Sequence, residues 1–265
     1  MFDEKFTQLH NVQDPLEQFK RATELLILNQ QLGVEISRIR KIAIDRAVTE
    51  LDLNYVEIAE SVNLTKSRIT QIRKAAPPKE REFFGYGPVT IAIPQRKQEG
   101  REFGQVDYGD LQARNQLQEF LEKMTLETKQ VEIEADQSLD FIGDTVAICG
   151  PKNSLVIQEA LAQDKRVKFV ESPSGQWHLE DTAGNQIAGK NELGYIGRLT
   201  IEGRNVLVIA GLHVAGSVGA IQYLTAHLHE IYQKVGTKNF SMIVDSKLES
   251  TTVVDSDVLL EALPL

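Results

Sequence analysis

The sequence predicts an α + α/β protein, in which a helical N-terminal region precedes a region built on a mostly parallel β-sheet. Two observations support this division. Up to residue 76, apolar side chains recur at helical spacing, whereas after residue 88 short apolar runs typical of strands alternate with helical stretches. Pro77 and Pro78 separate the two patterns, and proline ends helices. We therefore expect a helical domain over residues 1–76, a hinge over 77–88 and an α/β domain over 89–265.

Composition places the chain among globular proteins. Hydrophobic residues make up 42% and charged residues 25% of the 265 positions, which is ordinary for a folded protein. No apolar run approaches the roughly 20 residues that span a bilayer, and the first ten residues lack the apolar segment of a signal peptide. Cys149 is the only cysteine, which excludes an intrachain disulfide and fits a reducing compartment. We expect a cytoplasmic protein with no membrane partner.

The charge is distributed unevenly along the chain. The net charge is −9, but residues 1–82 contain 13 basic and 13 acidic side chains, so the acidic excess lies in the second region. Between Leu64 and Lys79 there are five basic residues and no acidic one. Because a local basic helix is enough to attract DNA, the N-terminal region is compatible with nucleic-acid binding despite the acidic chain.

Two helices are predicted before residue 52. Asp14 and Pro15 form a good helix start, with a capping side chain followed by proline at the first helical position, and apolar residues then follow a helical period to Leu32. Gly33 is typical of a helix stop, so a second helix is expected over residues 34–51. This second helix carries basic residues that are either auxiliary phosphate contacts or an ordinary solvated face: Arg38, Arg40 and Lys41.

Residues 52–74, DLNYVEIAESVNLTKSRITQIRK, have the pattern of a helix-turn-helix over 55–74. Two helices that cross steeply need a small residue at their contact, which Ala59 supplies, and a turn residue that tolerates positive φ, for which Asn63 is suited. Thr65 is a good N-cap for the second helix. The positions expected to be buried are Ile58, Val62, Leu64, Ile69 and Ile72. The alternative is a buried helical hairpin with a solvated basic face.

With these residues in view, the segment from Ile36 to Pro94 resembles bacterial helix-turn-helix proteins that are similar to region 4 of sigma factors. In some of them a similar Pro-Pro-x-Glu-Arg-x-Phe-Phe-Gly hinge, here residues 77–85, leads into an uncharacterised C-terminal domain. The resemblance covers about the first 95 residues and implies a transcription regulator that binds double-stranded DNA. It does not imply sigma activity, because no other sigma region is visible.

The second helix of such a motif enters the major groove, with the side chains near its N-terminus at the base edges. We expect Ser67, Thr70 and Gln71 to contact bases, since glutamine can pair bidentately with adenine. The basic side chains are expected to hold phosphates, although Lys66 is also a candidate for guanine. The predicted DNA-binding residues are Thr65, Lys66, Ser67, Arg68, Thr70, Gln71, Arg73 and Lys74.

The second region reads as a Rossmann-like α/β domain with an antiparallel meander over residues 165–202. Continuously apolar runs at 145–149 and 205–210 are typical of central parallel strands. The predicted strands are 89–94, 129–135, 144–150, 166–171, 176–181, 194–202, 205–211 and 240–247. The predicted helices are 109–124, 153–163 and 216–234.

Two predicted strands end in glycine-containing turns that lead into helices, at residues 150–154 and 211–219. Free backbone N–H groups and the positive end of a helix favour an anion such as phosphate. Both turns would lie at the carboxyl edge of the sheet, where open α/β folds bind ligands. The predicted ligand-binding residues are Gly150, Lys152, Asn153, Ser154, Gly211, His213, Gly216, Ser217 and Gly219. Glycines that serve packing alone are an equal alternative.

The candidate ligand is a nucleotide or another phosphate-bearing molecule, with no metal and no required cofactor. The second turn is loosely similar to that of Rossmann-like nucleotide-sensing domains of the lysine-decarboxylase-like class. Members with hydrolase activity carry a glutamate just after this turn, where this sequence reads Gly219-Ala220-Ile221-Gln222. We therefore expect a sensor and not an enzyme. The alternatives are a nucleotide hydrolase or glycosidase with a helix-turn-helix address domain, and an α/β domain that only dimerises or recruits.

Several further expectations concern partners and single residues. One helix-turn-helix covers one half-site, so we expect a homodimer that pairs through the helix around residues 16–28 or through the α/β domain. His213 is a candidate ligand contact or general base, with helix capping as its alternative. Trp177 is expected in the core, with a stacking platform for a base as the alternative. Cys149 is expected to pack at the end of a strand.

Overall fold

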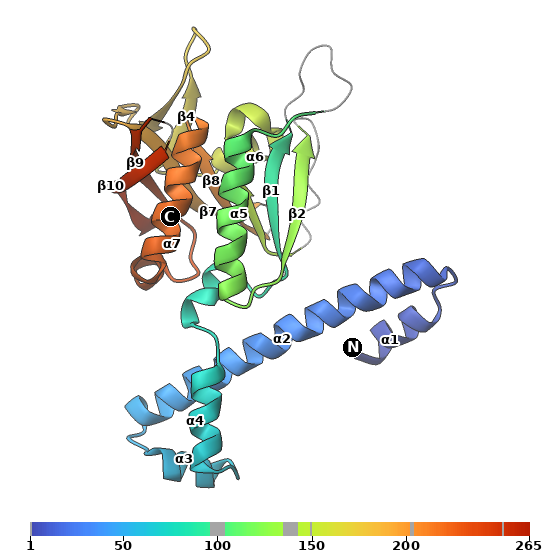
Figure 1. The fold of residues 1–265 in the computed structure, drawn as a ribbon. Helices are drawn as coiled ribbons and strands as arrows, with labels where there is room; N and C mark the ends of the chain where they lie inside the picture. Colours follow the sequence, from blue (N-terminus) through green and yellow to red (C-terminus); the bar gives the residue numbers. More distant parts are fainter. Residues whose placement is uncertain (1, 96–103, 135–142, 149, 202–203, 251) are drawn as a thin grey trace.

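The computed structural model describes residues 2–95, 104–134, 143–148, 150–201, 204–250 and 252–265, as a helical N-terminal region and a C-terminal mixed β-sheet with helices (Figure 1). The N-terminal helices are α1 (Phe2–His10), α2 (Pro15–Glu50), α3 (Tyr55–Ser61) and α4 (Lys66–Ala75). α1 folds back along the first part of α2, while α3 and α4 lie at the opposite end of α2 (Figure 1).

α2 begins as predicted but does not end at Gly33. The Asp14 carboxylate accepts a hydrogen bond from the Leu16 N–H at 2.9 Å, and Pro15 is the first helical residue. The predicted stop at Gly33 is wrong, because one helix runs through it to Glu50. A helical glycine costs about 1 kcal/mol relative to alanine. Here helix-forming residues continue on both sides, and Gln31 and Glu35 beside the glycine are held by tertiary hydrogen bonds.

The end of α2 packs with α3 and α4 around a small core. Asn63 in the turn has φ = 54°, and the Thr65 hydroxyl accepts from the Arg68 N–H at 3.2 Å, which confirms both local predictions. The buried apolar residues are Ile44, Ile58, Ala59, Ile69 and Ile72. The predicted burial of Val62 and Leu64 is wrong, since they are 51% and 38% exposed. Three helices do not close around them, so they line an open groove instead.

The described residues of the C-terminal region form two sheets and three α-helices. The main sheet holds β1 (Val89–Gln95), β2 (Thr128–Glu134), β3 (Thr145–Ile148), β7 (Glu192–Ile201), β8 (Arg204–Gly211), β9 (Phe240–Glu249) and β10 (Thr252–Pro264). The small sheet holds β4 (Val167–Glu171), β5 (Trp177–Asp181) and β6 (Gln186–Ile187). The helices are α5 (Tyr108–Lys123), α6 (Leu155–Leu161) and α7 (Val214–Val235), with 3₁₀ helices η1 (Lys79–Phe84) and η2 (Pro151–Asn153).

The main sheet has the order β10-β9-β7-β8-β3-β1-β2 and is mixed, which corrects the prediction of a mostly parallel sheet. β2, β1, β3 and β8 are parallel neighbours, whereas β7 pairs antiparallel with β8 and β9, and β9 with β10. The cause is connectivity: β7–β8 and β9–β10 follow each other directly in the chain and pair antiparallel, and β9, which runs parallel to β8 after the crossover helix α7, is antiparallel to β7 as well. The predicted meander is split: β4, β5 and β6 form the antiparallel small sheet, while β7 joins the main sheet.

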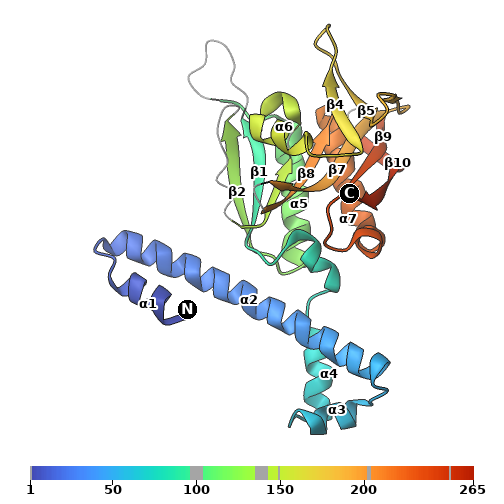
Figure 2. The same ribbon diagram turned by 180° about the vertical axis from the view of Figure 1, so that it is seen from behind.

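The main sheet is covered on both faces. Along β8, Leu207 and Ile209 face the cluster beneath α5 and α7, whereas Val206 and Val208 face α6 and the small sheet. Successive strand residues point to opposite faces, which explains why this run is apolar at every position. Figure 2 shows α6, β4 and β5 on the face opposite to α7.

Residues 77–88 are an anchored connection between the two regions. Phe83 and Phe84 are buried in the cluster of the sheet, and Phe83 contacts Phe240 at a ring distance of 5.6 Å. Asp144, at the start of β3, accepts from the backbone N–H groups of Tyr86 and Gly87 at 2.6 and 2.9 Å. The predicted hinge is thus anchored on the sheet from Phe83 to Gly87.

Most of the predicted strands and helices of the second region agree with the structure in type and approximate bounds. β10 was not predicted from the sequence. In the structure, alternate residues over much of this strand differ in burial. α1 and the two-residue β6 were also not predicted. Cys149 lies outside the described residues.

Candidate functional site

α4 presents an exposed basic face. Five of the eight predicted DNA-binding residues have exposed side chains and no acidic partner among the described residues: Lys66, Ser67, Arg68, Gln71 and Lys74. The Arg68 guanidinium lies 3.4 Å from the Gln71 amide oxygen, so these two side chains are neighbours on one face. This face is available to a partner because the apolar side of α4, at Ile69 and Ile72, is turned toward α2 and α3.

The other predicted residues of α4 have structural partners. Thr65 caps the helix, and the Thr70 hydroxyl donates to the Lys66 carbonyl at 3.1 Å. Arg73 forms an ion pair with Asp45 of α2 at 2.5 Å and lies over the ring of Tyr55, 5.6 Å from its centroid. Arg73 therefore joins α4 to α2 and α3, in addition to any contact with phosphate.

A basic hollow of about 260 Å³ lies beside Arg73, lined by Lys41, Tyr55, Thr70, Arg73 and Lys74. It brings Lys41, a candidate phosphate contact, next to α4. Arg38 is a different case, because it is buried and pairs with Glu35 and Glu82 at 2.5 Å each. The idea that Arg38 contacts phosphate is therefore wrong, while Arg40 remains exposed.

A cavity of about 340 Å³ opens at the carboxyl ends of β1, β3 and β8. β2 lies on one side of β1 and β3 on the other, so the chain reverses its direction of progress across the sheet at this point. The crevice outside the strands at such a reversal is the usual ligand site of open α/β folds. The lining residues are Pro94, Asp110, Gly150, Pro151, Lys152, Phe169, Trp177, Gly211, Leu212, His213, Val214 and Ser217.

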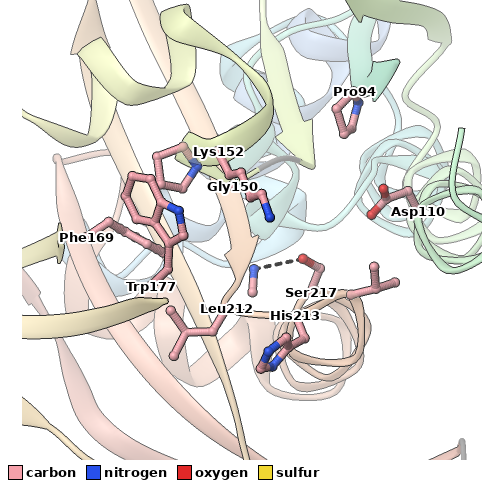
Figure 3. Close-up of a pocket in the computed structure, with 12 residues that line it drawn as sticks. Pro94, Asp110, Gly150, Lys152, Phe169, Trp177, Leu212, His213 and Ser217 are labelled. Carbon is pink, nitrogen blue, oxygen red and sulfur yellow. Dashed lines mark hydrogen bonds between the residues drawn. The ribbon is translucent and has the colours of Figure 1, made fainter. Parts of the chain in front are cut away.

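Both predicted turns reach this cavity. Figure 3 shows Lys152 extending toward its middle, with Trp177 and Phe169 on one side and Pro94 and Asp110 on the other. The Ser217 hydroxyl accepts from the Gly211 N–H at 2.8 Å, a bond that leaves the hydroxyl hydrogen for another acceptor. His213 Nδ1 lies 2.9 Å from Glu192, and its side chain does not cap α7.

Three predicted ligand residues, Ser154, Gly216 and Gly219, do not line the cavity. Ser154 is buried and caps α6. The backbone of Asn153 belongs to η2, and its side chain lies outside what the structure describes. Gly216 and Gly219 face the sheet: a Cβ on Gly216 would lie 2.2 Å from the Leu193 carbonyl oxygen, and one on Gly219 would lie 2.5 Å from Ser246 Cβ. These two glycines allow α7 to approach the strands closely, so their assignment to the ligand is corrected to packing.

Sequence reasoning named Trp177 only as an alternative stacking platform and did not identify Phe169 or Asp110 as lining residues. Phe169 and Trp177 come from β4 and β5 of the small sheet, and Asp110 comes from the first turn of α5. None of them is near the glycine turns in sequence. The pairing of β4 with β5, which sets Glu171 opposite Trp177, places Phe169 and Trp177 together at the cavity, whereas α5 supplies Asp110.

The described residues were also compared with the requirements of a metal site and of a membrane-spanning helix. The described residues contain no group of three or more His, Cys, Asp or Glu side chains arranged to hold a metal ion. Across the described ranges, no helix combines the length and the apolar character needed to cross a bilayer. When the sequence is compared with protein families and with curated proteins, no match is found.

Proposed function

We propose that this protein is a transcription regulator that binds double-stranded DNA sequence-specifically in the cytoplasm, through a helix-turn-helix formed by α3 and α4. The observation that carries the proposal is the exposed basic face of α4, at a helix whose N-terminal turn is capped and free of acidic residues. In this arrangement Ser67 and Gln71 read base edges, while Lys66, Arg68 and Lys74 hold phosphates. Lys41 adds a phosphate contact beside α4.

We further propose that the C-terminal region is a Rossmann-like sensor for a small anionic ligand, and that the protein is not an enzyme. Three features support this: the cavity lies at the reversal point of the sheet, Lys152 extends into it, and α7 begins at its wall. The start of α7, which is helical from Val214 to a kink at His227, favours a negative group through its first N–H groups and its dipole.

α7 offers a physical route from the cavity to the DNA-binding unit. Its first turn lines the cavity, and its last turns contact η1, where His229 lies 2.6 Å from Glu80 and the Tyr232 hydroxyl donates to Glu82. Glu82 pairs in turn with Arg38 of α2. A ligand that favours one position of α7 can therefore change the position of α2, by at most its difference in affinity for the two states.

A second copy of the chain is the proposed partner for DNA binding. The first part of α2 exposes large apolar side chains, with Leu16 80%, Phe19 74% and Leu26 58% exposed. A two-fold pair of helix-turn-helix units would cover two half-sites about one helical turn apart. Light scattering of the full chain, free and with DNA, should give the mass of a dimer; a monomer in both would contradict it.

The test of DNA binding starts from selection of duplexes out of a random library by the full chain. On the selected duplex, Gln71→Ala should relax preference at one base pair by about 1–3 kcal/mol. Lys74→Ala should weaken all duplexes alike and reduce the salt slope by about 1. Lys129→Ala, an exposed lysine on β2, is the matched control and should change neither. Selection of no sequence, or equal loss of preference in both variants, would contradict the proposal.

A further inference from the structure

The cavity at the carboxyl edge of the sheet has two chemically different sides. Trp177 and Phe169 come from the small sheet, whereas Lys152, Ser217 and the start of α7 come from the edge of the main sheet. In Figure 3 the indole and phenyl rings stand together on one side, and the Lys152 ammonium lies between them and Ser217. One side is therefore aromatic, the opposite side carries the Ser217 hydroxyl, the start of α7 and the Asp110 carboxylate, and the Lys152 ammonium lies between the two sides.

The aromatic side is held in place, but Trp177 is not a member of the core. Phe169 packs edge-on against the buried Tyr195, with ring centroids 5.6 Å apart, which fixes its position. Trp177 belongs to neither apolar cluster of the sheet region and remains half-buried against the cavity. A large aromatic ring that lines a cavity without filling the core is suited to stacking on a planar group.

The indole N–H of Trp177 gives a second, independent indication. It is buried and has no hydrogen-bond partner among the described residues. Buried donors are almost always bonded, so an unpaired one indicates a missing acceptor.

The charges place the anionic part of such a ligand at the other side. Lys152 supplies a positive charge, Ser217 can donate its hydroxyl hydrogen, and the His213 side chain leaves the first N–H groups of α7 uncapped. Asp110 lies at the far side of the cavity from Trp177 and disfavours a negative group there. An anion is thus best accommodated between Lys152 and the start of α7.

We propose that this cavity binds a molecule that combines one planar ring with one anionic group, the ring on Trp177 and the anion at Lys152 and the start of α7. The proposal rests on the proposed sensor function and adds the ring to it. A volume of about 340 Å³ is near the lower end of the roughly 300–1,000 Å³ of ligand pockets. The cavity therefore fits the scale of a mononucleotide and not that of a dinucleotide.

The sequence provides its own reporter, because Trp177 is the only tryptophan. Intrinsic fluorescence of the full chain should be titrated with the four common nucleoside 5′-monophosphates and with ribose 5-phosphate, which has the anion but no ring. At least one nucleotide should bind roughly 5- to 150-fold more tightly than ribose 5-phosphate, the range expected for stacking of one base, and should change the emission. Calorimetry with the same compounds gives an independent affinity.

Variants separate the two sides of the cavity. Trp177→Ala should reduce the affinity for the nucleotide to that for ribose 5-phosphate, while the affinity for ribose 5-phosphate stays unchanged. Trp177→Phe should restore most of the difference in affinity between the two compounds. Calorimetry measures both variants. Lys152→Ala should weaken the binding of both the nucleotide and ribose 5-phosphate. Lys129 lies near the start of β2, at the edge of the sheet opposite to the cavity, so Lys129→Ala should weaken the binding of neither.

Each outcome bears on a different part of the proposal. If ribose 5-phosphate binds as tightly as every nucleotide, the proposed stacking of a ring on Trp177 is contradicted, while the proposed anion site is supported. If neither the nucleotides nor ribose 5-phosphate bind by fluorescence or calorimetry, the proposed ring site and the proposed sensor function are both contradicted. The proposal of DNA binding is tested by its own experiment and is not affected. If chromatography shows that a bound nucleotide is converted, the sensor proposal is replaced by an enzyme and the ring assignment survives.

Discussion

The α2–α4 unit and the sheet region are stabilised in different ways. In the described residues of the α2–α4 unit, five buried apolar side chains hold three helices together, and the groove beside them stays open. The sheet region has two clusters, one on each face, to which β3, β7, β8 and β9 contribute on both sides and β1 on one side. The helical unit carries its candidate function on exposed side chains of one helix, while the sheet region carries it in a cavity that separate elements build together.

This difference has a physical consequence. Exposed side chains of a helix can be exchanged with little effect on stability, because few contacts depend on them. Cavity residues such as Gly211 and Ser217 also shape the backbone around them, so their exchange alters fold and function together. Substitutions in the two regions should therefore differ in what they break, as well as in how much.

The largest loss of stability is expected when an isoleucine is truncated to alanine in the core of the α2–α4 unit or in the core of the sheet region. Ile69→Ala and Ile209→Ala each remove a fully buried side chain, at a cost of about 2–5 kcal/mol. Ile69→Ala should melt the α2–α4 unit alone, since its core is small, and abolish DNA binding while ligand binding survives. Ile209→Ala should destabilise the sheet region instead. Hydrogen exchange by region would reveal this; uniform loss of protection in both variants would contradict the comparison.

The next effect concerns the contact between the regions. Arg81 is fully buried, and its guanidinium donates to Gln31 and to the Tyr86 carbonyl at 2.8 Å and pairs with Glu35 at 3.3 Å. Arg81→Met should lower the free energy of unfolding by about 3 kcal/mol, because it removes a partner from a buried pair.

Arg46→Met is the matched control for the buried arginine. Arg46 pairs with Glu50 at 2.7 Å, but its side chain is 66% exposed, so its loss should lower the free energy of unfolding far less than the loss of Arg81. Urea unfolding of both variants measures the difference. Equal midpoints would show that the contact between the regions contributes no more than a surface pair.

A smaller effect should separate two neighbouring basic residues of α4. Arg73 bonds to Asp45 and contacts Tyr55, whereas Lys74 has no such partner in the described part of the chain. Arg73→Ala should weaken DNA binding and also lower the stability of the α2–α4 unit by up to about 1 kcal/mol. Lys74→Ala should weaken DNA binding alone. Thermal unfolding curves that coincide for the two variants would contradict the structural role of Arg73.

The smallest effect is a pH dependence at the end of α7. Burial, and then the hydrogen bond to Glu82, raise the pKa of Tyr232 from its ordinary value of 10.0 to about 12. Because the folded state holds the proton more tightly, this stabilisation is complete below pH 10 and is lost as the pH rises through about 12. The stability of the wild type should therefore fall relative to Tyr232→Phe across this window.

Arg198 titrates in the same range with the opposite sign. Burial lowers the pKa of Arg198 to about 10. As the pH rises above that value, Arg198 loses its proton in the folded state, and the cost of burying its charge disappears. Since Arg198 is present in both proteins, the difference between wild type and Tyr232→Phe isolates the tyrosine. Unfolding curves that stay parallel from pH 9 to pH 12 would contradict the assignment.

Features that depend on a few neighbouring residues were predictable. The caps at Asp14 and Thr65, the positive φ of Asn63 and the apolar run of β8 each follow from local stereochemistry or from the alternation of a strand between two buried faces. The exposed face of α4 could be predicted for the same reason, because the side of a helix that packs is set by its own period.

By itself, then, the sequence determined most of the helices and strands, the turn at Asn63 and the basic face of α4. Only the tertiary structure decided that α2 continues through Gly33, that Arg38 is buried against Glu82, and that Gly216 packs against the backbone of β7. It also decided that Trp177 meets Lys152 in one cavity. The physical reason is that these outcomes depend on residues far apart in the chain, whose approach is set by strand order and packing and leaves no periodic trace in either partner.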